Sequence, residues 1–331
     1  MSTDRYSLKE LNLESTLGAV GQETDQRTVP VIDLSDFDQR KNEIADQLWL
    51  AASDIGFLQL KNHGISTTRM DQAFALAQAF FELPETTKAR YPLVGHSNAG
   101  WESKTQIRPS TGTRDQKESY QITRPRMTDL WPSATELPQF KTFMLDFEQQ
   151  CWQLGMKILS CFALKLGFKE DFFTLAHAPD QADFQSTLRL LHYYPVTAID
   201  GADHWRAGAH TDFDCLTMVF QREGQGGLQL CPGKEADSNH WTSVTPANDV
   251  ITCNIGDMLM RWSDDVLKST LHRVRMPKPE EHQGSRYSLA YFCQANRHVM
   301  IQGPARKYTP ISAGEYLKQR IQANFAGGQT R

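Results

Sequence analysis

The cysteines of this sequence form no recognisable framework. There is no Cys-x-x-Cys pair, and six cysteines are scattered without regular spacing from residue 151 onward. A disulfide-linked secreted domain or a cysteine-ligated zinc site needs closer, more regular spacing. The first 21 residues also lack the apolar segment of a secretory signal. We therefore expect buried thiols in a reducing compartment, and a cytoplasmic protein.

Long apolar runs and basic clusters are missing as well. No stretch approaches the roughly 18 apolar residues that a membrane span needs, so no membrane partner is expected. The formal net charge is -4 and lysine and arginine form no clustered face, which argues against nucleic acid. No internal repeat or low-complexity tract interrupts the chain. These absences leave a small molecule as the expected partner, and they leave the oligomeric state open.

The N-terminal part of the sequence alternates strand and helix patterns. Residues 1–27 form a polar arm with a weak helical pattern at 8–17. The next segment is β-branched and ends in Ser35 and Asp36, which are typical helix N-caps. Apolar residues then recur at helical spacing on either side of a short strand pattern. The expected elements are a strand at 28–35, a helix at 41–55, a strand at 57–61 and a helix at 67–82.

Residues 91–138 fit no regular element, because they are rich in Gly, Pro, Ser and Thr. So long an irregular stretch in a compact domain is typical of a functional loop or lid, with a partly ordered surface excursion as the alternative. The longest helix is expected at 140–166, where Phe143 and Phe147 belong to an apolar stripe. Gly167 is its natural C-terminal cap.

Short strand patterns separated by turns dominate the chain from residue 188. Strands at this spacing favour a sandwich or barrel over a parallel α/β sheet. The fold is therefore expected to be mainly β with flanking helices, the last of them at 316–323. The expected strands are 188–194, 216–220, 227–230, 250–255, 270–275 and 287–293.

Two histidines and one aspartate are the candidate metal ligands. His210 and Asp212 are two residues apart, so on a strand they would share a face, and His272 lies in another expected strand. Two imidazoles and one carboxylate occupy one face of octahedral Fe(II) and leave positions for O2 and an organic co-substrate. The same donors also suit zinc. His-x-Asp alone is a common chance pattern; its combination with His272 and a downstream Arg-x-Ser favours an iron site.

The Arg-x-Ser pair is formed by Arg286 and Ser288, which face the same way on an expected strand. A guanidinium binds a carboxylate through two parallel charge-assisted hydrogen bonds, and a serine hydroxyl adds a third. The rest of this strand is largely apolar, so an inward arginine there needs a partner. We expect that partner to be the distal carboxylate of the co-substrate.

The strand at 188–194 supplies two further candidates. Its alternation places Arg189 and Tyr193 opposite a leucine-rich face, so both are expected to point inward. Tyr193 would donate to the co-substrate carboxylate, with Tyr194 as the alternative if the register differs. Arg189 would meet an acidic or carbonyl-bearing substrate, or else form a structural ion pair.

Three aromatic residues complete the candidate substrate contacts. Phe213 follows Asp212, and Phe292 shares the face of Arg286, so both are expected beside the open metal positions. Tyr120, within the irregular stretch, is the third. Aromatic residues at such places are by default part of the core.

Several motifs together resemble the isopenicillin N synthase-like branch of the Fe(II)/2-oxoglutarate dioxygenases, over about residues 28–325. Within this branch, three segments resemble most strongly thymine dioxygenases and microbial natural-product oxygenases: Leu188-Arg-Leu-Leu-His-Tyr193, Arg261-Trp-Ser-Asp264 and Arg286-Tyr-Ser-Leu-Ala-Tyr-Phe-Cys293. The motifs are Pro30-Val-Ile-Asp33, Gly56-Phe57, Asn62-His63-Gly64, His210-Thr-Asp212, Gly226-Gly-Leu228, Asn254-Ile-Gly-Asp257, His272-Arg-Val274 and Arg286-Tyr-Ser288.

The resemblance implies a double-stranded β-helix, or jelly roll, with helices packed outside. It implies an arm at 1–27, an N-terminal region at 28–135 packed on the barrel, and the dioxygenase core with its C-terminal helix at 136–325. Fe(II) would be the cofactor, 2-oxoglutarate and O2 the co-substrates, and ascorbate a stimulant. The implied reaction oxidises a C–H bond and forms succinate and CO2. Hydroxylation is its default outcome, with desaturation or ring rearrangement as variants.

Three alternatives remain open at the level of sequence. An iron oxidase of the isopenicillin N synthase type would use Arg286 and Ser288 for its substrate and need no 2-oxoglutarate. A zinc hydrolase could use the same three ligands. A barrel that only binds or senses a ligand would need no intact metal triad.

Overall fold

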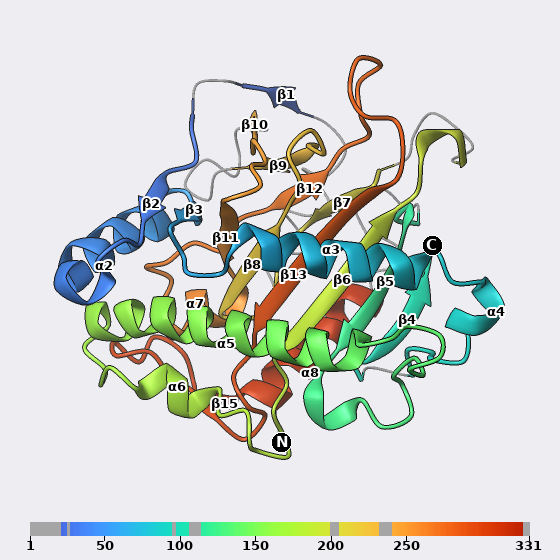
Figure 1. Cartoon of the computed structure of the whole chain (residues 1–331). Helices are drawn as coiled ribbons and strands as arrows, with labels where there is room; N and C mark the ends of the chain where they lie inside the picture. Colours follow the sequence, from blue (N-terminus) through green and yellow to red (C-terminus); the bar gives the residue numbers. More distant parts are fainter. Residues whose placement is uncertain are drawn as a thin grey trace.

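The computed structural model describes residues 21–24, 27–94, 97–105, 114–198, 205–231 and 240–326 (Figure 1). The helical pattern at 8–17 lies outside these ranges. Within them, no helix has the length and apolar character that crossing a membrane requires.

Two sheets pack against each other and form a double-stranded β-helix, as expected. The larger has eight strands in the order β2-β3-β11-β8-β13-β6-β5-β4. The smaller has five in the order β1-β10-β9-β12-β7. The strands of the larger sheet are β2 (Val31–Asp33), β3 (Phe57–Lys61), β11 (Ile251–Ile255), β8 (Leu216–Phe220), β13 (Arg286–Cys293), β6 (Thr187–Tyr193), β5 (Lys117–Ile122) and β4 (Gly100–Ser103). Those of the smaller are β1 (Gln22–Glu23), β10 (His240–Ser243), β9 (Leu228–Leu230), β12 (His272–Val274) and β7 (Ala207–His210), and β14 (Met300–Ile301) pairs with β15 (Ile311–Ser312) apart from both.

Long helices cover the outer face of the larger sheet. In Figure 1, α3 (Thr67–Phe81) and α5 (Phe140–Lys165) lie across β8, β13 and β6, and α2 (Phe37–Asp54) packs beside α5. The periodic face of α5 is buried, and Gly167 follows its end at a φ of 78°, which favours glycine. The shorter helices are α4 (Glu85–Lys88), η1 (Arg124–Arg126), α6 (Phe172–Ala176), η2 (Val196–Ala198), α7 (Asp257–Trp262) and α8 (Ala313–Ala326).

The apolar core is divided by the larger sheet. Its outer face and the helices enclose the main cluster, which includes Phe80, Phe147 and Leu190. A smaller cluster between the two sheets includes Phe57 and Leu230. Because one face of each central strand contacts the helices, the other face is left to line the space between the sheets.

The strand and helix predictions are confirmed for most of the chain. The strands at 57–61 and 216–220 have the expected bounds, and the expected helices correspond to α2, α3, α5 and α8. The helix expected at 41–55 begins earlier, at Phe37, and its N-cap Asp36 has a φ of 51° and no capping side-chain bond.

The expectation for residues 91–138 is wrong in part. This stretch contains β4 and β5, and β5 is buried along its whole length. Four strands of the larger sheet, β2, β3, β4 and β5, come from the region 28–135. Its strand β5 has no apolar alternation because polar groups are needed on both faces. Lys117 and Gln121 line a cavity, while Glu118 forms buried ion pairs on the helix side.

Candidate active site

The three predicted metal ligands lie together at one end of the smaller sheet. His210 ends β7 and His272 begins β12, and the two residues are direct partners in the antiparallel pairing of these strands. The Nε2 atom of His272 is 3.7 Å from Asp212 Oδ2, and Nε2 of His210 is 4.0 Å from Asp212 Oδ1. One donor atom from each of the three residues lies within 4.8 Å of the others. This is a compact site for one metal ion.

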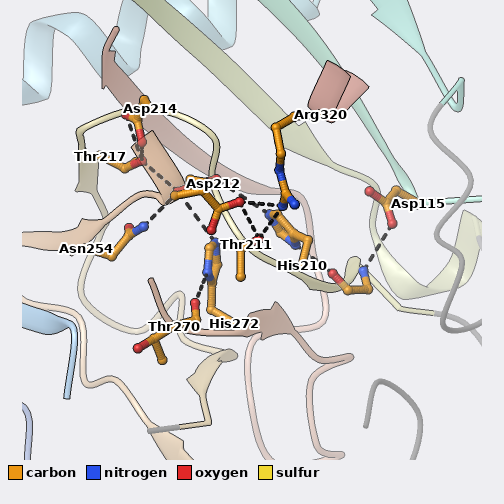
Figure 2. Close-up of polar contacts among 12 residues, drawn as sticks. Asp115, His210, Thr211, Asp212, Asp214, Thr217, Asn254, Thr270, His272 and Arg320 are labelled. Atoms are coloured by element: carbon orange, nitrogen blue, oxygen red, sulfur yellow. Dashed lines mark hydrogen bonds and ion pairs between the residues drawn. The ribbon is translucent and has the colours of Figure 1, made fainter. Parts of the chain in front are cut away.

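Backbone carbonyls orient both imidazoles. The Nδ1 atom of His210 is 2.8 Å from the oxygen of Gly208, and Nδ1 of His272 is 3.1 Å from the oxygen of Thr270. A carbonyl can only accept, so each Nδ1 carries the hydrogen and each Nε2 lone pair is directed to the site (Figure 2). The ring of Phe57 contacts His272 edge-on at 5.5 Å between ring centres.

Asp212 is held by groups that the sequence did not reveal as functional. It lies in the loop after β7 and not on the strand, so the expected shared strand face is wrong although the two ligands do converge. Its Oδ2 accepts from Thr217 Oγ1 at 2.6 Å and from Asn254 Nδ2 at 2.8 Å (Figure 2). Oδ1 is the oxygen facing His210.

Asp214 extends this network away from the metal site. It is fully buried, and burial together with the Asp212 carboxylate raises its pKa well above the ordinary value. Thr217 has a single hydroxyl hydrogen, which the shorter bond assigns to Asp212. The oxygen of this hydroxyl also lies 3.1 Å from Asp214 Oδ2, so the two carboxyl groups share one threonine hydroxyl.

A cavity of about 810 Å³ opens beside the triad and extends between the sheets. Arg286 and Ser288 line it from β13, and Tyr193 lies opposite Arg286 on β6. The guanidinium of Arg286 is 4.7 Å from the centre of the Tyr193 ring. The inward direction predicted for Tyr193 and Arg189 is confirmed, because both line this cavity.

The surroundings of the Arg286 guanidinium suit the binding of an anion. It is 1% exposed, and its Nε donates to the carbonyls of Gln225 and Gly226, both at 3.0 Å. Its Nη1 is buried and has no hydrogen-bond partner among the residues that the structure describes. A buried guanidinium nitrogen without an acceptor is costly, so this geometry fits an incoming carboxylate.

Of the four residues predicted to contact the substrate, three line the cavity and one does not. Arg189 donates from Nη2 to Gln121 Oε1 at 3.0 Å, and its guanidinium is 4.8 Å from the centre of the Phe292 ring. Phe213 and Phe292 both line the cavity. The structure does not bring Tyr120 there, which corrects that part of the prediction. Tyr120 points to the helices, where its ring lies tilted against that of Phe80 with the ring centres 4.2 Å apart, and its hydroxyl donates to the Leu130 carbonyl at 2.5 Å.

Two family models match the sequence. One, described as non-haem dioxygenase in morphine synthesis N-terminal, covers residues 29–139. The other, the 2OG-Fe(II) oxygenase superfamily, covers residues 185–295 and so contains the triad and Arg286. A proline hydroxylase of Petromyces alliaceus is 32% identical, with 80% of this chain and 85% of that protein covered.

Solved structures agree with these matches. Neurospora crassa thymine 7-hydroxylase in complex with α-ketoglutarate has a TM-score of 0.78 and 32% identity, covering 92% of this chain and 99% of its own. The chain is a 2OG-Fe(II) oxygenase. A family member from Caulobacter crescentus has a TM-score of 0.77 at 29% identity, covering 89% of this oxygenase and 99% of its own chain. The resemblance inferred from the motifs is thus confirmed.

The geometry of the site fits the cofactors of the family. Two imidazole nitrogens and a carboxylate oxygen form a donor set that suits Fe(II). 2-Oxoglutarate, also called α-ketoglutarate, is the co-substrate, and the buried Nη1 of Arg286 is a donor that has no partner among the described residues. The enzyme is therefore a 2-oxoglutarate-dependent dioxygenase, and the hydrolase and sensor alternatives are set aside.

Charged residues near Arg286 and Tyr193 were missed from the sequence. Arg206 is buried, and burial together with the nearby charge of Arg286 lowers its pKa to about 10. Lys117 lines the cavity, with Nζ 3.1 Å from Asp115 Oδ2. Asp115 Oδ1 in turn accepts from the amide of Gly208 at 3.1 Å, which supports β7 just before His210 (Figure 2). An arginine at the start of a strand, or a charged residue in a stretch without a regular pattern, gives no indication in the sequence that it lies beside a functional site.

Proposed function

We propose that this oxygenase hydroxylates a C–H bond of a small molecule with a polar, hydrogen-bonding edge. His210, Asp212 and His272 would hold Fe(II), and Arg286, Ser288 and Tyr193 would hold 2-oxoglutarate. The observation that carries the proposal is the convergence of the triad and the buried Nη1 of Arg286 on one cavity.

When bound, Fe(II) supplies the activation of O2 at the cavity. In balance, 2-oxoglutarate, O2 and R–H give succinate, CO2 and R–OH, with one oxygen atom in each of succinate and the alcohol. The protein orients the two organic molecules and excludes water from them. The guanidinium of Arg286 would fix one end of the co-substrate, and apolar side chains such as Leu191 and Val219 would limit the access of solvent to it.

The cavity supports a substrate that presents a flat face and hydrogen-bonding atoms. Phe292 offers an aromatic surface, and Arg189 lies against that surface while bonded to Gln121. Gln121 itself donates to Glu102 Oε1 at 3.1 Å, so the polar groups form a connected row. The Neurospora enzyme solved with thymine and the proline hydroxylase suggest heterocycles and cyclic amino acids as the first compounds to test.

We further propose a cytoplasmic location. All six cysteines are buried and free, which suits a reducing compartment.

The test is an anaerobic Fe(II) titration with and without 2-oxoglutarate, followed by the visible metal-to-ligand charge-transfer band. The wild type is expected to show the band only with both ligands present. Arg286→Gln should weaken it, because the co-substrate loses its charged anchor. Arg40→Gln is the control, since Arg40 is paired with Glu43 on the surface helix α2. A succinate-release screen over heterocycles and cyclic amino acids then identifies the substrate.

The iron oxidase of the isopenicillin N synthase type is the alternative that this experiment addresses. If iron binds, no band forms and substrate is oxidised at the full rate without 2-oxoglutarate, the roles proposed for Arg286 and Ser288 are wrong.

A further inference from the structure

The C-terminal helix α8 forms part of the cavity wall. Leu317 and Ile321, one helical turn apart, line the cavity that also contains the triad. Between them lies Arg320, which is 1% exposed. In Figure 2 its side chain extends toward the segment that carries His210 and Asp212. A buried arginine at this place needs anionic or polar partners, and their identity links α8 to the metal site.

Asp257 and Thr211 are among the partners of Arg320. The guanidinium forms an ion pair with Asp257, and its Nη2 lies 3.2 Å from Thr211 Oγ1. Thr211 Oγ1 in turn donates to Asp257 Oδ2 at 3.1 Å. The amide of Asp257 also donates to the carbonyl of Asp212 at 2.8 Å. Three segments that are distant in the sequence therefore meet beside Asp212, and one of them, at Asp257, bonds its main chain.

Arg320 also contacts the residue on the other side of Asp212. Its guanidinium is 4.8 Å from the centre of the Phe213 ring, which faces the cavity. One side chain from α8 thus touches the residue before Asp212 and the residue after it. Asp212 itself receives its side-chain bonds from Thr217 and Asn254. The carboxylate and the main chain of this ligand are held by separate groups.

We propose that Arg320 is a positioning residue through which α8 sets the orientation of Asp212 toward the metal and of Phe213 toward the substrate. This inference rests on the proposed function. Displacement of α8 then loosens the ligand loop, and a substrate packed on Leu317 and Ile321 holds the helix, and with it the loop, in place. The consequence is that 2-oxoglutarate turnover stays coupled to substrate oxidation only while the Arg320 contacts are intact.

Three variants test this. Thr211→Val has nearly the same shape and removes the bonds to Arg320 and Asp257 while leaving their ion pair. Arg320→Met removes the ion pair as well, and Arg320→Lys restores the charge without the planar fork. Lys318→Met is the control, because Lys318 is an exposed residue of the same helix. Each is compared for anaerobic Fe(II) affinity, the position of the charge-transfer band, and 2-oxoglutarate consumed per substrate oxidised.

Loss of a group that orients a metal ligand typically weakens metal affinity or activity by about 10- to 100-fold. We expect a loss in this range for Arg320→Met and a smaller one for Thr211→Val. Both should shift the band and consume more 2-oxoglutarate per product, with the KM for 2-oxoglutarate unchanged because Arg286 is intact. Arg320→Lys should recover part of the affinity. Lys318→Met should match the wild type.

Two results would overturn the inference while leaving the proposed function in place. One is a Thr211→Val protein with the band, affinity and coupling ratio of the wild type, which also decides the case if Arg320→Met does not fold. The other is an Arg320→Met protein that is less heat-stable yet unchanged in band and coupling, which would make Arg320 a structural anchor only. A wild type without the band would instead refute the proposed function.

Discussion

At the scale of single residues, the metal site depends on how Asp212 is held. Its Oδ2 accepts hydrogen bonds from Thr217 and Asn254, and both donors come from strands of the larger sheet. Asp212 itself lies in a loop, which alone would leave its carboxylate free to rotate. The sheet therefore supplies the rigidity that the loop lacks.

Thr217→Val is expected to weaken Fe(II) binding. Valine keeps the shape of threonine but removes the hydroxyl that donates to Asp212 at 2.6 Å and also lies within hydrogen-bond distance of Asp214. The affinity should fall by about 10-fold or more, as for other groups that orient metal ligands. Anaerobic titration measures it. The control is Thr252→Val, also buried in the same sheet but bonded to Gln221. Equal affinity in the two variants would contradict the role given to Thr217.

The residues that could be predicted from the sequence are those whose chemistry is rare. His210, Asp212 and His272 form a set of donors that could hold a metal ion, and Arg286 stands out in an apolar strand. Thr217 and Asn254 could not be found as supports for Asp212, because threonine and asparagine are common in strands. Only the pairing of β8 with β11 brings these two side by side. Tyr120 was misplaced because its strand has no apolar alternation to define the inner face.

At the scale of elements, β5 is held by a buried charge cluster on its outer face. Glu118 is 2% exposed, and it accepts from Lys88 Nζ at 2.8 Å and from Trp101 Nε1 at 2.7 Å. His192 of the neighbouring strand lies 2.8 Å from its other oxygen. The cluster thereby joins α4, β4, β5 and β6 into one unit that carries Lys117 and Gln121 on its inner face.

Lys88→Met is expected to destabilise the protein, because Glu118 would lose its lysine partner inside the structure. Removal of one member of a buried ion pair costs about 3 to 5 kcal/mol, and the remaining donors should keep the loss near the lower end. Urea unfolding measures the free energy. Lys41→Met is the control, since Glu170, the partner of Lys41, has a side chain that is 62% exposed, and pairs at the surface contribute at most about 1 kcal/mol. Similar losses in both variants would show that Lys88 is not needed for β5.

The elements predicted well are those with a single apolar face. The apolar stripes of α3 and α5 and the apolar runs of β3 and β8 show in the sequence where each of these elements lies. By contrast, β5 was taken as irregular, because its polar residues serve a cavity on one face and a charge cluster on the other. The functional requirement that makes β5 important also removes the pattern by which a strand is recognised.

At the scale of the whole molecule, the larger sheet separates two environments. Helices and aromatic side chains fill one side, and a cavity lined by both polar and apolar side chains lies on the other. Burial therefore acts on titratable groups throughout the structure. It raises the pKa of Asp214 and Asp257, and it lowers the pKa of His177 to about 4. The acids and the histidine affect the dependence of stability on pH with opposite signs.

His177 is expected to make folding sensitive to acid. It is fully buried near the end of α6, with Nδ1 2.7 Å from the Phe173 carbonyl, while its own carbonyl accepts from Trp152 at 2.8 Å. The unfolded chain binds a proton near pH 6.5, but the folded chain does so only near pH 4. Between these values the unfolded state holds more protons, so this contribution to stability is complete above pH 6.5 and is lost as the pH falls.

The size of this effect follows from the pKa difference, and a variant isolates it from the buried acids. A shift from 6.5 to about 4 corresponds to about 3 kcal/mol at pH 4. His177→Gln keeps a donor for the Phe173 carbonyl but cannot titrate, so its midpoint of thermal unfolding should fall less steeply than that of the wild type between pH 7 and pH 4. The acids are common to both proteins and cancel in the comparison. Parallel curves would mean that His177 is protonated in the folded state without penalty, and that burial on the helix side of the sheet does not control its charge.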